Sequence, residues 1–258
     1  MDITTLLGLI VGIGGLLIAV LLEGGHLSSL ISLPAFVMIA GGTLGATAIG
    51  FTMEELKNIP VLLRIAFREE SHDIGQLIST LVGFAEKARR EGLLALEEDL
   101  AVLEDKFLRK GMQLVIDGTD AELVRSIMET ELAFIQERHH KGASIFEAAG
   151  GYAPTMGIIG TVMGLVHVLG NLKDTDSLGP AIATAFLATL YGIFSANIFF
   201  PPIAGKLKNR SSHQVLVYEV TLEGILSVQA GDNPRIVEEK LEAFLPPVKR
   251  QSAKSQSE

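Results

Sequence analysis

The chain has 258 residues, a net charge of −9 and a mean hydropathy of +0.40. The negative charge gives no support for nucleic-acid binding, which needs a basic surface, and the absence of cysteine excludes a disulfide framework and a Cys-ligated metal. Small and aliphatic side chains dominate the apolar fraction, with 27 glycines and no Trp, as in packed membrane helices. This composition indicates a membrane protein.

Four stretches contain no Asp, Glu, Lys or Arg: residues 3–22, 27–51, 148–172 and 177–205. Each is long enough to cross the hydrocarbon core of a bilayer, about 30 Å, as a helix. Buried helices of a soluble protein would carry a polar stripe, which these stretches lack. The first has neither the basic segment nor the cleavage site of a secretory signal, so we expect it to be retained. The sequence therefore predicts an all-α membrane protein with four transmembrane helices.

The distribution of Lys and Arg predicts the orientation of these helices. Residues 52–144 hold 12 of the 21 basic residues, and the segment after Gly205 holds eight more. The connection between the first two spans holds none, and the one after the third span holds only Lys173. Because basic residues accumulate on the cytoplasmic side, we expect the middle domain and both termini in the cytoplasm.

Helical periodicity predicts a compact helical bundle for the cytoplasmic part. The first helix covers residues 73–90, Gly92 interrupts it, and a helical pattern resumes over residues 93–108. A third helix starts near Ala121 and continues into the third span. A further helix is expected from residue 206 to about 228.

The C-terminal region ends in a short helix and a tail. Asn233 is expected to cap the helix and Pro234 to take its first position. The last residues are polar without apolar periodicity, so we expect them to be disordered. The predicted organisation is two spans (1–51), a cytoplasmic helical domain (52–145), two spans (146–205), C-terminal cytoplasmic helices (206–247) and a disordered tail (248–258).

No catalytic motif is present: the sequence lacks a GxxxxGK[ST] phosphate loop, an HExxH zinc motif and a nucleophile elbow. Neighbouring carboxylates such as Glu97 and Glu98 lie among many other charges, as on a solvated surface. We therefore expect no enzymatic activity and no cofactor.

Three stretches form a pattern in a fixed order. Residues 88–97 read ARREGLLALE, residues 152–165 read YAPTMGIIGTVMGL, and residues 179–192 begin with GPA and end with FLATLYG. Together with the four spans, they resemble the MotA/PomA/MotP family of flagellar motor stator subunits over residues 1–247. In that family, the first stretch is similar to the rotor-facing motif and the second to the ion-channel helix.

The resemblance implies a stator subunit that forms an ion channel with a MotB/PomB/MotS-type partner and converts ion-motive force into torque. It implies five copies of the chain around two partner helices, with the membrane aspartate supplied by the partner. It also implies contact with the rotor protein FliG and a place in the bacterial cytoplasmic (inner) membrane, within the lipid bilayer.

The residues by themselves support one part of this assignment, namely that the membrane carboxylate comes from a partner. An ion pathway through a membrane usually contains a titratable side chain, yet none of the four spans contains Asp or Glu. If this chain takes part in ion conduction, another chain must bring the carboxylate.

The third span presents Gly157, Thr161 and Gly164 on one helical face, and Gly160 forms a GxxxG pair with Gly164. Two interpretations stay open. Small residues suffice for close helix packing, and a Thr hydroxyl can bond to its own backbone. Alternatively, the glycines admit a partner helix and Thr161 offers its oxygen to a cation.

The resemblance implies that Thr161 and Thr189 lie on the ion pathway, together with Pro154, Gly157 and Gly164. Threonines at positions 161 and 189 are typical of sodium-driven members of the family. Because hard cations prefer oxygen ligands, we expect Na⁺ coupling, with H⁺ coupling as the alternative. We expect no metal beyond Na⁺ passing near Thr161.

Four residues of the spans have further expected roles. The resemblance implies that Pro154 and Pro202 couple channel movement to the cytoplasmic domain, whereas the residues alone indicate ordinary kinks. His167 is expected to be a neutral hydrogen-bonding partner between helices, with a proton relay as the alternative. Tyr191 is expected to serve in packing rather than as a ligand.

The resemblance assigns rotor contact to Arg89 and Glu97, with Arg90, Glu91 and Glu98 as lesser candidates. From chemistry alone these charges would form a solvated face, because exposed ion pairs contribute little energy. Complementary charge mainly steers binding and sets register, which suits a contact that forms and breaks repeatedly.

Three other functions compete with the stator assignment. The ExbB/TolQ class of energising subunits has three spans and another charge layout. A self-contained transporter would carry its own membrane carboxylate or an internal repeat. An inert membrane scaffold fits the residues and is disfavoured only by the resemblance.

Overall fold

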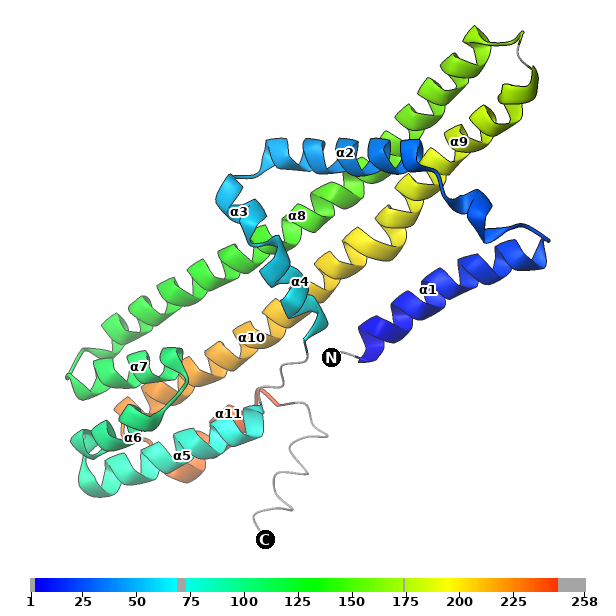
Figure 1. The fold of residues 1–258 in the computed structure, drawn as a ribbon. Helices are drawn as coiled ribbons and strands as arrows, with labels where there is room; N and C mark the ends of the chain where they lie inside the picture. Colours follow the sequence, from blue (N-terminus) through cyan, green and yellow to red (C-terminus); the bar gives the residue numbers. More distant parts are fainter. Residues whose placement is uncertain (1–2, 69–72, 174, 246–258) are drawn as a thin grey trace. The chain divides into compact units, whose positions relative to one another are not determined.

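The computed structural model of the chain describes residues 3–68, 73–173 and 175–245 (Figure 1). These residues form helices joined by short turns, and none of them belongs to a strand. Within this part of the chain, four helical segments are long and apolar enough to cross a membrane: Ile3–Leu22, Leu27–Gly50, Ala121–Gly170 and Thr175–Gln229. The predicted all-α membrane fold with four spans is confirmed. The predicted tail, residues 248–258, lies outside the described residues.

The chain forms two compact units, each of which is described by itself. Unit 1 comprises Met1–Glu69 and His139–Asn209, and unit 2 comprises Glu70–Arg138 and Arg210–Glu258. The helices α8 (Ala121–Gly170) and α10 (Phe200–Gln229) contribute to both. These boundaries differ from the predicted domain boundaries at residues 51, 145 and 205.

Unit 1 begins with α1 (Ile3–Leu22), a short 3-10 helix η1 (Leu27–Leu30) and α2 (Leu33–Gly50). The second predicted span is therefore not one continuous helix. The backbone is extended at Ile31 and Ser32, and the Ser32 hydroxyl accepts a hydrogen bond from the Ala35 amide at 3.4 Å to cap α2.

Two short helices, α3 (Met53–Lys57) and α4 (Ile59–Phe67), follow in unit 1 and were not predicted. A capping box between Thr52 and Glu55 starts α3, in which each residue's side chain accepts a hydrogen bond from the other's backbone amide. The pKa of the Glu55 carboxyl is lowered mainly by the hydrogen bond from the Thr52 amide.

The helix α4 packs against parts of α8 and α10, which explains why unit 1 extends beyond the predicted spans. Its residue Ala66 belongs to a buried cluster with five others: Ala143, Phe146, Ile203, Ala204 and Leu207. Close approach is possible at Gly142, where an added Cβ would lie 2.8 Å from the Leu62 side chain.

The fourth span is α9 (Thr175–Phe194), a π-helical segment η3 (Ser195–Phe199) and the start of α10. The helix predicted to start at residue 206 is thus continuous with the span and begins at Phe200. In η3 the Phe200 amide donates to the Ser195 carbonyl. Pro201 and Pro202 have no amide hydrogen to continue the α-helical ladder, which accounts for the wider turn just before them.

Unit 2 begins with α5 (Ile74–Glu91), close to the predicted bounds, and the Asp73 carboxylate caps it by accepting a hydrogen bond from the Gly75 amide. Gly92 ends α5 with φ +86°, a conformation that favours glycine. The prediction of one helix over residues 93–108 is wrong: η2 (Leu93–Leu96) and α6 (Glu97–Val102) are followed by a break and by α7 (Lys106–Ile116).

The break before α7 has a clear cause. The Asp105 carboxylate accepts hydrogen bonds from the amides of Phe107 and Leu108, at 2.8 and 3.0 Å, and so caps a new helix. Apolar residues continue across the break with similar spacing, which is why periodicity alone did not reveal it.

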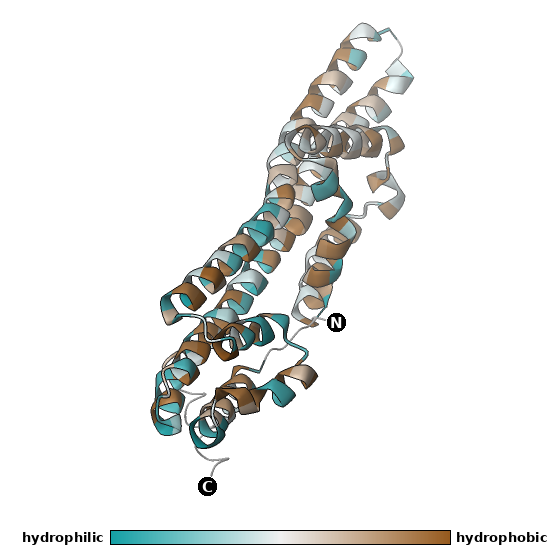
Figure 2. Cartoon of the chain, turned by 90° about the vertical axis from the view of Figure 1, so that its left-hand side faces the viewer, coloured by the Kyte–Doolittle hydropathy of each residue, from teal (hydrophilic) through white to brown (hydrophobic). Residues whose placement is uncertain are grey.

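The rest of unit 2 comes from the first part of α8, the last part of α10 and α11 (Pro234–Glu242). The prediction for α11 is confirmed, because the Asn233 side chain accepts from the Arg235 amide at 3.0 Å. The helices of unit 2 have hydrophobic (brown) and hydrophilic (teal) faces in Figure 2, and the hydrophobic faces enclose one core. Fully buried members of this core include Leu81, Met112, Met128, Val220, Ile225 and Leu241.

Candidate functional site

Within unit 1, α8 and α9 approach closely through small residues. A Cβ added at Gly157 would lie 3.1 Å from the Ala188 carbonyl oxygen, and one at Gly164 would lie 2.5 Å from the Ala185 Cβ. At Gly160 it would lie 2.6 Å from the Ala188 Cβ. The face that one of the two interpretations assigned to a partner's helix is therefore occupied by α9 of the same chain. Close packing, the alternative interpretation, is confirmed for these glycines.

The matching face of α9 was missed by the sequence reasoning. A Cβ at Gly192 would lie 2.5 Å from the Ala153 carbonyl oxygen, so this position requires glycine as strictly as those on α8. Ala185 and Ala188 are each 2% exposed. The signal was present in the sequence, because small residues at positions 185, 188 and 192 recur at helical spacing.

Thr161 and Thr189 face each other at this contact, and their hydroxyl groups are hydrogen-bonded. The Thr161 hydroxyl also lies 3.0 Å from the Ala185 carbonyl oxygen and 3.2 Å from that of Gly157. The Thr189 hydroxyl lies 3.2 Å from the same Gly157 oxygen. The structure therefore brings together four oxygen atoms, two from hydroxyls and two from backbone carbonyls, which we call the oxygen cluster.

The oxygen cluster has the donor atoms that hard cations prefer. Its two hydroxyl hydrogens serve four oxygens, each with two lone pairs, so the cluster has more acceptors than donors. It carries no formal charge, and no described residue of α8 beyond Glu147 or of α9 beyond Asp176 is acidic. It can coordinate a cation in passing, but it cannot neutralise one.

Tyr191, on another face of α9, fixes the start of α2. Its hydroxyl donates to the Leu30 carbonyl oxygen at 2.5 Å and accepts from the Ser32 amide at 2.9 Å. The ring lies against a small buried cluster of Ala35, Ile39 and Ala188. This contact agrees with the expected packing role and adds hydrogen bonds across the break between η1 and α2.

The prolines lie in different surroundings. Pro154 is half-buried inside α8, which continues through it without a break. Pro202 is exposed and lines a groove beside α1. The proline that packs on α8 is Pro201, whose Cγ would lie 2.8 Å from a Cβ at Gly150. The sequence reasoning named Pro202 for coupling and missed its neighbour.

His167 is exposed and lines a groove of about 460 Å³ between α2, α8 and α9. Its ring forms no hydrogen bond with any residue that the structure describes. The expected hydrogen bond between helices is therefore not made with any of the described residues.

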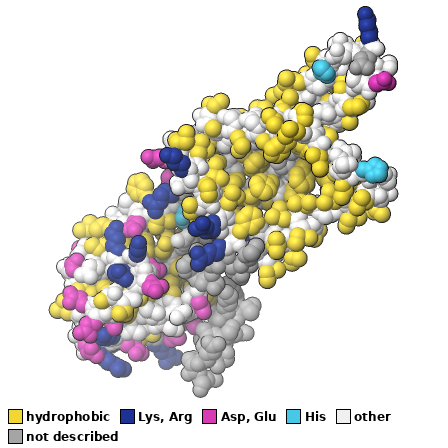
Figure 3. Space-filling view, viewed as in Figure 1, with side chains coloured by type: hydrophobic (Ala, Val, Ile, Leu, Met, Phe, Trp, Pro, Cys, Tyr) yellow, Lys and Arg dark blue, Asp and Glu magenta, His cyan; other side chains and the backbone are white. Residues whose placement is uncertain are grey.

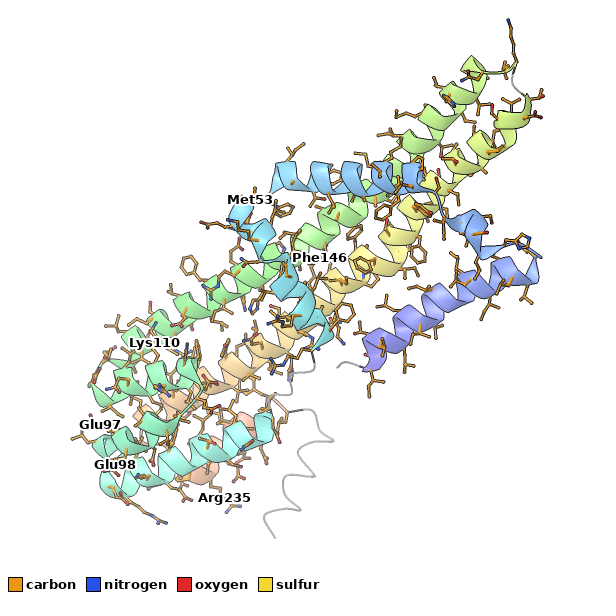
Figure 4. The ribbon with its side chains drawn as sticks, in the orientation of Figure 1. Met53, Glu97, Glu98, Lys110, Phe146 and Arg235 are labelled. Atoms are coloured by element: carbon orange, nitrogen blue, oxygen red, sulfur yellow. The ribbon has the colours of Figure 1, made fainter. Side chains whose placement is uncertain are left out.

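In unit 2, the charges of residues 88–98 gather around one turn. Arg89, Arg90 and Glu91 end α5, while Glu97 and Glu98 begin α6, and all five side chains are exposed. Figure 4 shows Glu97 and Glu98 next to each other at this end of the unit. We call the five residues the charged tip.

The charged tip is held by contacts beneath it. Leu96 is fully buried in the core of the unit. Lys87 of α5 forms an ion pair with Asp99 of α6 at 2.7 Å, and this hydrogen bond raises the pKa of the Lys87 ammonium above its ordinary value. Of the ion pairs between described residues, none involves Arg89 or Glu97.

Comparison with known proteins identifies the family. The model of the MotA/TolQ/ExbB proton channel family matches residues 100–220, and that of the motility protein A N-terminal region matches residues 6–92. Motility protein A of Bacillus subtilis is 42% identical over 247 residues, which cover 95% of this chain and 92% of that protein. The chain belongs to the motility protein A family. Chemotaxis protein PomA of Vibrio alginolyticus is 37% identical, over 97% of this chain and 98% of that protein.

A solved structure agrees with this membership of the motility protein A family. A chain of the flagellar MotAB stator complex from Bacillus subtilis is 41% identical and matches with a TM-score of 0.91. The match covers 97% of this chain and 99% of that chain. The oxygen cluster, Pro154 and Pro202 lie within residues 100–220, which the MotA/TolQ/ExbB model matches. Glu97 and Glu98 fall between the two regions that the family models match.

Proposed function

We propose that this chain is the channel-forming subunit of a flagellar stator, assembled with a MotB-type partner. The relatives named above and the stator complex from Bacillus subtilis support this assignment. The observation that carries the mechanism is the oxygen cluster at Thr161 and Thr189, which has cation ligands and no anion. The partner supplies the membrane aspartate, and this chain supplies neutral oxygens beside it.

The coupling ion in this proposal is Na⁺. A proton is passed along hydrogen bonds and needs no set of ligands, whereas Na⁺ that loses its water must find replacement oxygens. Two hydroxyls that are hydrogen-bonded to each other and lie 3.0–3.2 Å from two backbone carbonyl oxygens fit that need. No catalytic chemistry is proposed for the chain.

The proposed assembly follows the family resemblance. Five copies surround two partner helices, both termini lie in the cytoplasm, and the charged tip meets the rotor protein FliG. Exposure of Arg89, Arg90, Glu97 and Glu98 supports such a contact. The four membrane-length helices and the match to the motility protein A N-terminal region favour the stator over an ExbB/TolQ-type energising subunit.

The proposal is tested by motility of cells that lack their own stator and express this chain with its partner. Swimming speed is measured while Na⁺ and pH are varied separately. For Thr161→Ala, we expect the Na⁺ concentration at half-maximal speed to rise about fivefold, since a lost hydrogen-bonding ligand is worth about 1 kcal/mol. Thr161→Ser keeps the hydroxyl and should behave as the wild type.

The matched control is Thr155→Ala, on the same helix. The Thr155 hydroxyl donates to the Tyr152 carbonyl of its own helix at 2.8 Å and is exposed, so its loss should leave the Na⁺ dependence unchanged. Undiminished swimming without Na⁺ would refute Na⁺ coupling. Failure of the wild-type pair to restore any motility would instead refute the stator assignment.

A further inference from the structure

Unit 2 carries an apolar surface that lies outside its own core. Leu123, Ile127 and Phe134 of α8 follow one another at spacings of four and seven residues, so they share one side of the helix. Leu123 is 54% exposed and Phe134 is 62% exposed, and none of the three belongs to the core of the unit. The α8 side chains that do belong to that core lie on another side: Val124, Met128 and Ile135. We call Leu123, Ile127 and Phe134 the apolar stripe.

Membrane lipid does not explain the exposure of the apolar stripe. Figure 3 shows charged side chains gathered over unit 2. This part of α8 carries charges on both sides of the stripe, unlike the membrane spans: Glu122, Arg125, Glu129 and Glu131. Single apolar side chains are common on a surface that faces water, whereas a continuous row of large ones marks a contact with another protein.

A positively charged row borders the apolar stripe. Glu131, four residues after Ile127, forms an ion pair with Lys110 of α7 at 2.5 Å, so α7 lies along the stripe (Figure 4). Lys106 precedes Lys110 by one turn, and Arg109 lies beside them; both are exposed. Among the described residues, no ion pair involves Lys106 or Arg109. We call these two residues the basic row.

The opposite side of α8 is acidic. Glu129 follows Ile127 by two residues, a rotation of about 200° around the helix. Arg125, one turn before Glu129, reaches Glu223 of α10 at 3.9 Å, so α10 lies along this side. Three exposed carboxylates lie here, which we call the acidic row: Glu122 and Glu129 of α8, and Glu219 of α10 one turn before Glu223. Arg125 offsets part of the charge through an ion pair with Glu129 at 3.6 Å.

Complementary surfaces on opposite sides of one unit fit a head-to-tail contact between identical copies. A two-fold contact brings the same surface of both copies together, which would place one basic row against the other. In a head-to-tail contact, the basic row of each copy meets the acidic row of the next. Such contacts close into a ring when the rotation between neighbouring copies allows it.

The number of copies in the proposed assembly also favours a second copy as the occupant. With five copies around two partner helices, every copy presents the same stripe and the same rows. Two partner helices cannot cover five equal surfaces, whereas the next copy covers each of them. The charged tip shares no residue with these surfaces, so the proposed rotor contact does not compete for them.

We propose that neighbouring copies of this chain contact each other through these surfaces, an inference that rests on the proposed five-copy assembly. The basic row of one copy pairs with the acidic row of the next. The apolar stripe packs against Ser126 and Ala133 of the next copy, two small, exposed residues about one turn on either side of Glu129. Complementary charge sets the register of the contact, and burial of the stripe stabilises it.

The first test joins single cysteines across the contact, because the chain has none of its own. Two versions of the chain with different tags are expressed together with the partner subunit, one with Lys106→Cys and the other with Glu129→Cys. A bifunctional maleimide should produce dimers that carry both tags. Arg235→Cys, an exposed position of unit 2 outside the three surfaces, replaces Glu129→Cys as the control, and the mixed dimers should then be lost.

The second test weakens the apolar contact. Phe134→Asn should raise the concentration at which the purified complex dissociates on dilution by about tenfold, since burial of a large apolar side chain contributes at least that factor. Ile236→Asn is the matched control, because Ile236 is 58% exposed on α11 of the same unit and outside the stripe. It should dissociate at the wild-type concentration. The number of copies per complex is measured by native mass spectrometry.

The third test reverses whole rows, so it does not depend on one pair of residues. Lys106→Glu with Arg109→Glu should weaken assembly, because the row then faces the acidic row of the next copy with the same charge. Glu122→Lys with Glu219→Lys should weaken it as well. All four substitutions together should restore assembly, because the two rows are then complementary again.

Each test has a result that would overturn the proposed contact. Cross-links would join only like versions of the chain, Phe134→Asn and Ile236→Asn would dissociate alike, or the four substitutions together would assemble no better than two. Swimming of cells with the wild-type pair is measured in parallel. If any of these results came with restored swimming, the contact would be refuted and the stator assignment would stand. Mixed dimers without swimming would support the contact and refute the stator assignment.

Discussion

Thr161 and Thr189 differ from Thr47 and Thr155 in the direction of their hydrogen bonds. Thr47 and Thr155 donate to carbonyls of their own helix, at Thr43 and Tyr152. Thr161 reaches Ala185 on α9, and Thr189 reaches back to Gly157 on α8. Hydroxyls that bridge two helices can exchange one oxygen partner for another when the helices shift slightly, which suits a passing cation.

The sequence could indicate Thr161 and Thr189 as candidate site residues, but it could not show that their hydroxyl groups are in contact. Residue type and the family resemblance pointed to both positions, whereas their contact depends on the register between α8 and α9. That register is set by Gly157, Gly160 and Gly164 against Ala185 and Ala188. Small residues are common in membrane helices, so their spacing predicts close packing without naming the partner helix.

Lys87 offers a prediction at the scale of one residue. Its pKa lies above the ordinary value of 10.5 because the ammonium donates a hydrogen bond to Asp99. The pair's contribution to stability is therefore fully present below pH 10.5 and is lost as the pH rises through the raised pKa. Lys57, an exposed lysine on α3 in the other unit, serves as the internal control for the measurement.

The measurement is the rate of Lys87 acetylation as a function of pH, followed by mass spectrometry of the purified complex. The midpoint should be higher in the wild type than in Asp99→Asn, which removes the acceptor's charge. The rate of Lys57 acetylation should be the same in both proteins at every pH. Equal midpoints for Lys87 in the two proteins would show that the hydrogen bond does not control its titration.

At the scale of the element, the contact between α8 and α9 predicts the effect of a single methyl group. Gly164→Ala would place a Cβ 2.5 Å from that of Ala185, and the two backbones must separate to admit it. Overpacking of this kind costs about 1–3 kcal/mol. The melting temperature of the purified complex should fall, and the separation of Thr161 from Thr189 should also impair motility.

Gly151→Ala is the control for that substitution. Gly151 lies in the same helix, is exposed, and has no atom within 4 Å of an added Cβ. Alanine favours helix over glycine by up to about 1 kcal/mol, so the melting temperature should stay level or rise. If both variants melted alike, the close approach of α8 and α9 would not be important for stability.

The elements show where sequence reasoning succeeded and where it stopped. Gly92 and Asn233 act through a single backbone angle and a local hydrogen bond, and their roles were predicted correctly. The cap at Asp105 is equally local, but the apolar periodicity over residues 93–108 concealed it. The capping box of Thr52 and Glu55 was readable as a threonine three residues before a glutamate.

Other features depended on contacts between distant segments. The short helix α4 joins unit 1 because Ala66 packs with Phe146 and Leu207, which lie far away in the sequence. Pro201 and Pro202 are adjacent in the chain, but only Pro201 packs against Gly150 of α8. Periodicity describes one helix at a time and carries no information on which neighbour covers each face.

At the scale of the whole molecule, the proposed stator must convert ion passage into movement through the charged tip. One elementary charge crossing 100 mV releases about 2.3 kcal/mol. An exposed ion pair contributes about 0–1 kcal/mol, less than one ion supplies. A rotor contact made of exposed charges can therefore form and break in each cycle, whereas a buried apolar contact could not.

Charge reversal at the tip tests this arrangement. Arg89→Glu and Glu97→Arg should each lower motor torque severalfold, because complementary charge sets the register of a transient contact. Neither should prevent membrane insertion or co-purification with the partner, since both side chains are exposed and Leu96 holds the turn from beneath. Torque is measured from the rotation of beads attached to single flagella.

Arg235→Glu provides the matched control, because Arg235 is an exposed arginine of the same unit on α11 and outside the charged tip (Figure 4). The torque of the Arg235→Glu motor should equal that of the wild type.

A reversed charge at the end of α5 also disturbs the interaction with the helix dipole by about 0.3–1 kcal/mol, so the melting temperature of each variant is compared with its torque. If Arg89→Glu lost its partner or melted much earlier than Arg235→Glu, the tip charges would serve folding rather than the rotor. Retained assembly with lost torque, recovered by a reversed charge on the rotor, would establish the charged tip as the site where force is transmitted.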